Sequence, residues 1–294
     1  MRTLPKSTAC KTLCVAVLAA LVVFLQGCSA FKLAYNQVPN LAYWQLNSYL
    51  DLSDTQSVRV RDALGELQAW HRSAMLPRHA QLLQQVQQQL PAAITPEQAC
   101  LTYDDVRTQL NRVVAQAEPQ LVWLAAQLTD AQLSNLKKKQ AESNTDWQEE
   151  WLSPGPEKLR EQRYKQLLSR TETFYGPLQA PQKTALRAVI AQSSFDAQRT
   201  YNERLRRQND LTKLLQAIAQ DRSNTERART LVHDYIARFS ASPDAAYQRY
   251  ADALVQEGCR TFSQVHNAMS TTQRLNAVQA LNAYEQDFLV LANR

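Results

Sequence analysis

Glycine is the residue that this sequence most clearly lacks. Only 5 of the 294 residues are glycine, whereas an average chain of this length carries about twenty. The five are isolated, so neither the dinucleotide fingerprint G-x-G-x-x-G nor the phosphate loop G-x-x-x-x-G-K-[ST] occurs. Both loops need glycine because backbone amides approach the phosphates closely. The composition therefore excludes these nucleotide-binding folds and argues against hairpin-rich β structure, whose tight turns need positive φ.

Motifs of catalysis and metal binding are missing as well. No G-x-S-x-G elbow occurs, and no histidine belongs to H-E-x-x-H or to a cysteine-paired zinc spacing. Adjacent acids such as Asp104-Asp105 and Glu149-Glu150 diverge by about 100° on a helix, so we interpret them as exposed charges. We predict no catalytic residue, no metal site, no enzymatic activity and no cofactor other than a covalent lipid. The histidines are His71, His79, His233 and His266.

The first thirty residues have the pattern of a lipoprotein signal peptide. Arg2, Lys6 and Lys11 form a basic region, and an apolar run follows from Leu13 to Leu25. This run is shorter than the roughly 20 residues that span a bilayer but suits the core of a signal peptide. It ends in Leu25-Gln26-Gly27-Cys28, which resembles a bacterial lipobox.

The lipobox predicts where the chain is processed and located. Residues 1–27 are expected to be removed, and Cys28 is expected to carry diacylglycerol and palmitate. Two or three acyl chains hold a protein stably on a membrane. Ser29, where an Asp would favour the inner membrane, favours the inner leaflet of the outer membrane, with the body facing the periplasm. The alternative is a transmembrane anchor with an incidental cysteine.

Processing changes the charge of the chain. The formal charge of +6 includes three basic residues of the signal peptide, whose removal leaves 30 basic against 27 acidic residues, a balance of +3. Lys137-Lys138-Lys139 is the only tight basic run, and we interpret it as a solvated helix face rather than a polyanion contact. We therefore predict no nucleic-acid and no nucleotide partner.

Two cysteines remain after processing and lipidation, because Cys10 and Cys14 leave with the signal peptide. We predict a disulfide between Cys100 and Cys259, since the mature chain has two thiols and an oxidising compartment favours pairing. On the chain-entropy model the bond contributes up to about 5 kcal/mol. Two separately buried thiols are the alternative.

Helix starts recur along the mature chain. The pattern is a capping box, in which Ser or Thr is followed three residues later by Glu or Gln. A hydrophobic residue directly before the Ser or Thr adds a hydrophobic staple. Ser223–Glu226 has the box without the staple, and Leu178–Gln182 has a degenerate form. The irregular spacing does not support a strict solenoid period. The complete segments are Leu52–Gln56, Ile94–Gln98, Leu128–Gln132 and Met269–Gln273.

Apolar spacing between these starts is helical. Pro77 interrupts or restarts a helix, the pattern pauses at Pro119, and a single long helix is expected from Lys183 to about Gln220. We predict an all-α, elongated bundle of about eight to ten helices without a sheet. Residues 28–50 form the lipidated N-terminus with a short first helix, and residues 51–294 form one helical domain. The firmest breaks are Ser153–Pro156, Tyr175–Pro177 and Ser240–Pro243.

One block of residues stands out as a possible interaction site. Trp70, His71, Arg72 and Arg78 flank Pro77, and arginine beside an aromatic ring suits planar, bidentate recognition. The alternative is that the block fixes a corner between helices by packing and carbonyl capping. The tryptophans are expected to be mostly core anchors, although a partner surface stays open for Trp147 and Trp151: Trp44, Trp70, Trp123, Trp147 and Trp151.

Two resemblances to known families follow from these motifs. The N-terminal W-H-R…L-P-R block, with the preceding Tyr35-Asn36 and Asp51-Leu52-Ser53 motifs behind a lipobox, resembles a family of bacterial lipoproteins of unknown function. This resemblance implies a lipid-anchored, all-helical periplasmic protein and implies no activity. The pentapeptide Leu128–Gln132 is similar to the LTxxQ motif of the periplasmic chaperones of the Spy and CpxP type, although its letters also spell a generic helix start.

Two function classes remain. The first is a non-enzymatic envelope lipoprotein, a binding or structural module with a protein partner in the envelope and a lipid anchor in the membrane. The second is a tethered periplasmic chaperone of the LTxxQ type, which would shield unfolded clients on an amphipathic helical surface.

Overall fold

The computed structural model describes residues 28–293, and every regular element in this range is helical. The predicted all-α fold is therefore confirmed. The π-helical turn η1 (His71–Met75) connects α3 to α4. The α-helices are α2 (Cys28–Leu50), α3 (Asp54–Trp70), α4 (Leu76–Gln89), α5 (Pro96–Gln127), α6 (Asp130–Trp151), α7 (Pro156–Tyr175), α8 (Ala180–Ala191), α9 (Ala197–Ala219), α10 (Thr225–Ser240), α11 (Ala245–Asn267) and α12 (Thr271–Ala292).

The capping boxes expected from the sequence begin helices. Ser53, Thr95, Thr129 and Ser270 each accept a hydrogen bond from the backbone amide three residues later, while the glutamine there binds the cap's own amide. The degenerate box at Gln179 also closes, at the start of α8. The box at 223–226 does not form as expected, because α10 is capped by the side chain of Asn224 and not by that of Ser223.

Two breaks differ from the expectation. The single helix predicted from Lys183 to Gln220 is wrong: α8 ends at Ala191 and α9 begins at Ala197. Neither glycine nor proline causes this break. The Glu257 carboxylate accepts hydrogen bonds from the hydroxyls of Ser193 and Ser194, and the Asp196 side chain caps α9. These side-chain hydrogen bonds replace the backbone hydrogen bonds of a continuous helix. Conversely, α5 continues through Pro119 without a break.

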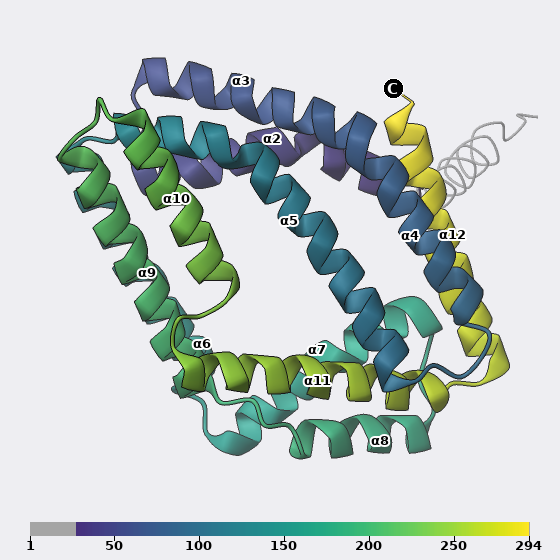
Figure 1. Ribbon diagram of the computed structural model, residues 1–294. Coiled ribbons are helices and arrows are strands. Elements are labelled where there is room, and N and C mark those ends of the chain that lie inside the picture. The colour runs from purple at the N-terminus through teal and green to yellow at the C-terminus, as the bar shows by residue number, and fades with distance from the viewer. Residues whose placement is uncertain (1–27, 294) are drawn as a thin grey trace, which may run out of the picture.

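The helices lie along the sides of a four-sided frame (Figure 1). One side holds α2 and α3, the next α4 and α12, the third α7, α8 and α11, and the last α9 and α10. Helix α6 runs behind the frame, and α5 crosses it diagonally. One end of α5 is tied to α11 by the Cys100–Cys259 disulfide, with the Cα atoms 5.3 Å apart. Its other end packs against α3 and α10.

A pair of buried glutamines lies at one corner of the frame, where α3 and α6 begin. Gln132 Nε2 donates to Gln56 Oε1 at 2.7 Å, and Gln56 Nε2 donates to Gln132 Oε1 at 3.3 Å. Each amide also donates to a backbone carbonyl in the junction that precedes the other glutamine's helix. Gln56 Nε2 donates to the carbonyl of Gln127, at the junction of α5 and α6, and Gln132 Nε2 donates to the carbonyl of Asp51, at the junction of α2 and α3. Both side-chain amides are therefore satisfied without water.

A second glutamine pair repeats this arrangement at the opposite corner, where α8 and α12 begin (Figure 1). Gln182 Nε2 donates to Gln273 Oε1 at 2.7 Å, and Gln273 Nε2 donates to Gln182 Oε1 at 3.1 Å. The additional acceptors are the carbonyls of Ala268 and Pro177. In both pairs, each acceptor carbonyl lies five residues before the partner glutamine.

Each glutamine pair is surrounded by its own hydrophobic core, and the two cores correspond by position. The residue four before each glutamine is buried in both cores, and so is the residue four after it. The fold is thus built on two related corners, a repetition that the irregular spacing of the motifs conceals. The residues four before are Leu52, Leu128, Leu178 and Met269, and those four after are Val60, Leu136, Leu186 and Ala277.

Replacing one glutamine of a pair should destabilise the whole protein. The change Gln132→Ala removes the donor to the Asp51 carbonyl and leaves part of the buried Gln56 amide without a partner, and we expect the free energy of unfolding to fall by about 2–4 kcal/mol. Urea denaturation followed by circular dichroism measures the loss. The exposed Gln216, on α9, provides the matched control Gln216→Ala, and an equal effect of the two changes would contradict the structural role of the pair.

Candidate membrane-attachment site

The residue predicted to carry the lipid is the first residue of α2. The remaining lipobox residues, Leu25, Gln26 and Gly27, lie outside the described part of the chain. Within residues 28–293, no helix has both the length and the apolar character that crossing a bilayer requires. The candidate site consists of the N-terminal part of α2, which contains Cys28, and the helices that hold it.

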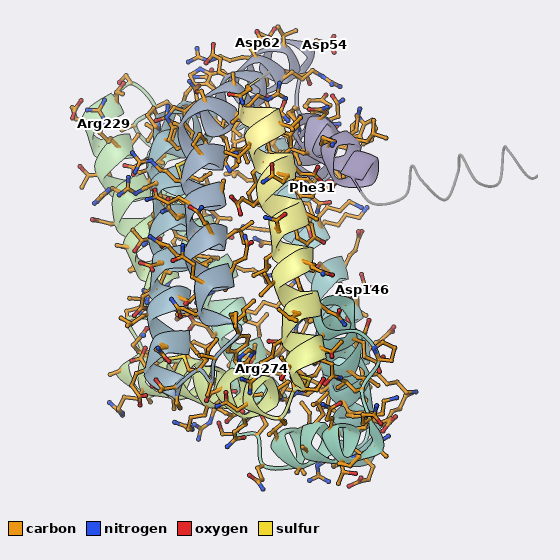
Figure 2. All side chains as sticks on the ribbon, turned by 90° about the vertical axis from the view of Figure 1, so that its right-hand side faces the viewer. Phe31, Asp54, Asp62, Asp146, Arg229 and Arg274 are labelled. Carbon is orange, nitrogen blue, oxygen red and sulfur yellow. A yellow bond between two sulfur atoms is a disulfide. The ribbon has the colours of Figure 1, made fainter. Side chains whose placement is uncertain are left out.

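Aromatic rings fix the beginning of α2 to α12. The ring of Phe31 lies 5.7 Å from that of Tyr284, edge-on, and 5.5 Å from that of Phe288, measured between centroids. Figure 2 shows Phe31 where α2 meets α12. Such pairs contribute about 0.5–1.5 kcal/mol beyond the area that they bury. The N-terminal part of α2 is thus packed against α12.

An ion pair strengthens this contact. Lys32 Nζ donates to Asp287 Oδ1 at 2.9 Å, and Asp287 is only 4% exposed. Lys32 is the only charged residue of α2. Because a buried carboxylate needs a partner, the pair fixes α2 in position and register on α12. We call Phe31, Lys32, Tyr284, Asp287 and Phe288 the α2 clamp.

The W-H-R block holds α2 from another side. Tyr35 Oη and His71 Nδ1 are 3.0 Å apart, and Arg72 Nη2 donates to Asn36 Oδ1 at 2.9 Å. The guanidinium of Arg72 also lies 5.7 Å from the centre of the Tyr35 ring. His71 and Arg72 therefore connect η1 to α2.

The other two residues of the predicted interaction site lie differently. Trp70 is half-buried at the end of α3, and Arg78 is exposed on α4, where it forms no hydrogen bond or ion pair with any described residue. Pro77 sits in the first turn of α4, directly after the π-helical turn. The structure brings His71 and Arg72 together against α2 and leaves Arg78 facing solvent.

Burial controls the protonation of the nearby histidines. The ring centroids of His71 and His79 are 5.3 Å apart. Burial lowers the pKa of His71, to which the neighbouring His79 adds, and burial also lowers the pKa of His79. Both rings are therefore neutral at pH 7, so they pack beside Tyr35 and Phe288 without introducing buried charge.

The other two histidines are far apart. His266 is fully buried in the second core, between the Tyr175 hydroxyl at 2.9 Å and the Ala92 carbonyl at 2.9 Å. Burial lowers the pKa of His266 and raises the pKa of Tyr175 to about 12. His233 lies on the surface beside Glu118. The contacts of His266 are those of a packed core residue, and the contact of His233 is a surface pair.

Sequence reasoning missed the α2 clamp because its residues come from opposite ends of the chain. Lys32 and Asp287 are 255 positions apart. A signal was present at both positions: Lys32 is alone in a 23-residue segment without acids, and Asp287 precedes the apolar run from Phe288 to Leu291. Single charges in such apolar surroundings tend to be paired when they are buried.

Over residues 28–293, the fold and this site define an all-helical protein in which α2 is clamped to α12. The chain belongs to the Family of unknown function (DUF6279), whose model matches residues 48–241, more than half of the chain. The match includes the first glutamine pair and η1 but not the clamp. Neither a curated protein nor a solved structure matches the chain.

Breaking the clamp should cost more than removing both of its charges. The change Lys32→Met leaves Asp287 buried and unpaired, and we expect the free energy of unfolding to fall by about 3 kcal/mol. The double change Lys32→Met with Asp287→Leu should recover most of this loss. Urea denaturation measures both variants. Lys139→Met, which breaks an exposed pair with Glu142, is the control and should behave as the parent protein. Additive losses in the double variant would contradict the pairing.

Proposed function

We propose that this protein is a bacterial envelope lipoprotein, anchored by lipid on Cys28 and carrying its helical body into the periplasm as a non-enzymatic binding or structural module. One observation carries the proposal: the cysteine of the lipobox belongs to helix α2 and lies four residues before Lys32, which clamps this helix to the body. A lipid attached there would restrain the whole molecule at the membrane and not merely a flexible tail.

The charged clusters of the body support a structural role for its polar groups. Glu203, 5% exposed, receives hydrogen bonds from Arg206 and Arg207 on its own helix and from the hydroxyl of Ser242. Burial alone would raise the pKa of Glu203, but the hydrogen bonds from the two arginines lower it below its usual value. The carboxylate therefore stays ionised and serves to hold α9 to the segment before α11.

A second function is favoured by one other observation. Exposed apolar side chains follow one face of α5, including Val106 at 43% and Leu110 at 60% exposure. A tethered chaperone of the LTxxQ type could hold unfolded clients on such a face. The face runs through Tyr103, Val106, Leu110, Val114 and Leu121.

Removing the proposed lipid acceptor should abolish lipid labelling of the protein. We expect Cys28→Ala to incorporate no radioactive palmitate in cells, because the change removes the sulfur atom that would carry the lipid. The parent protein should carry label and sediment with outer membranes. Ser29→Asp keeps the acceptor and serves as the control, since it should still be labelled. Label on the Cys28→Ala protein would refute the anchor.

An aggregation assay separates the two functions. With a binding or structural module, we expect an equimolar amount of the protein to leave the light scattering of a heat-denatured client unchanged. A chaperone would suppress it, and the double variant Val106→Glu with Leu110→Glu would lose the effect because charge blocks apolar contact. Suppression by the parent protein and its loss in this variant would replace the first function with the second.

A further inference from the structure

Helix α2 has an apolar face that no part of the described body covers. Leu33, Val38, Leu41 and Trp44 are exposed by 66%, 50%, 54% and 60% respectively. Trp44 was expected to be a core anchor, and this expectation is wrong. It points outward because Tyr43, which is 8% exposed, takes the inward position on the same turn. We call these four exposed residues the outer face of α2.

The outer face occupies one side of the helix. At 100° per residue, the four side chains fall within an arc of about 140°. The opposite side carries residues that hold α2 to the body, including Lys32, Tyr35 and Tyr43. Figure 2 shows α2 at the outer edge of the molecule, beside α12.

Charge distinguishes this face from the other exposed apolar residues. Every exposed residue between Leu33 and Ser48 is uncharged. The apolar face of α5, in contrast, is flanked by exposed Asp104, Asp105, Arg107 and Arg112. An uncharged face that combines aliphatic residues with an exposed tryptophan is suited to the interface between lipid headgroups and acyl chains, where tryptophan is enriched.

The position of Cys28 brings this face to the membrane. Because α2 begins at Cys28, no linker separates the proposed lipid from the helix. At 1.5 Å per residue, Leu33 lies about 8 Å and Trp44 about 24 Å along the helix axis from the lipid-bearing residue. The α2 clamp prevents the helix from swinging away from the body. Acyl chains at one end therefore hold the outer face within reach of the same bilayer.

We propose that the outer face of α2 lies in the headgroup region of the membrane, so that the helix rests along the bilayer and docks the body on it. This inference deepens the proposed lipid anchor and rests on it. The partner is a phospholipid surface, recognised by apolar contact and without charge pairing. Acyl chains would then supply the attachment, and the outer face would fix the orientation.

Nitroxide labels test the depth of this face in the lipidated, full-length mature protein, reconstituted into vesicles of phosphatidylethanolamine and phosphatidylglycerol. One label is placed at Leu41→Cys, on the outer face. The matched control is Leu110→Cys on α5, a leucine of similar exposure, 54% against 60%. The disulfide engages Cys100 and Cys259, and the lipid would block Cys28, so each variant carries one free thiol. Paramagnetic resonance then measures the access of oxygen and of a nickel chelate to each label.

We expect nickel access at position 41 to fall about tenfold below that at position 110, with oxygen access raised, because a label at the acyl boundary is shielded from water but open to oxygen. Equal nickel access at the two positions in protein that floats with the vesicles would overturn the docking and leave the anchor intact. Reduced access of both reagents at position 41 would indicate a protein partner and would also overturn it. Protein that fails to float would refute the anchor and the docking together.

Discussion

The structure depends on a hydrogen-bonding constraint. When a glutamine side chain is buried at a helix start, both its amide oxygen and its amide nitrogen must find hydrogen-bond partners. The oxygen closes the capping box of its own helix, and the nitrogen binds the partner glutamine and a carbonyl of the partner's junction. One residue type thus caps a helix and joins two helix junctions. A missing hydrogen bond would leave a buried polar atom without a partner. The relative position of the two helix starts is therefore fixed at each corner.

The rest of the frame follows from these two corners. Each is surrounded by its own hydrophobic core, and long helices span the distance between them. Helix α4 also packs along α12, and the Cys100–Cys259 disulfide joins α5 to α11. A protein built this way has two small cores and much helical surface. This architecture leaves apolar side chains exposed along one face of α2 and one face of α5.

Local signals were predictable from the sequence, whereas the distant contacts were not, apart from the Cys100–Cys259 disulfide. Ser53, Thr95, Thr129 and Ser270 were identified as helix caps because a capping box lies within four residues. The sequence did not indicate that the boxes pair, since the paired glutamines are 76 and 91 positions apart. The break after Ala191 depends on Glu257, which is remote in sequence. The clamp likewise depends on packing between the two ends of the chain.

The clamp also bears on the order in which the molecule can be completed. The hydrogen bonds of the first glutamine pair need no residue beyond Gln132, so they can form once less than half of the chain has been synthesised. Lys32, by contrast, finds its partner only in the last helix, at Asp287. Until α12 has been synthesised, α2 lacks the ionic and aromatic contacts of the clamp. The corner at the first glutamine pair can therefore form well before α2 is held at both of its ends.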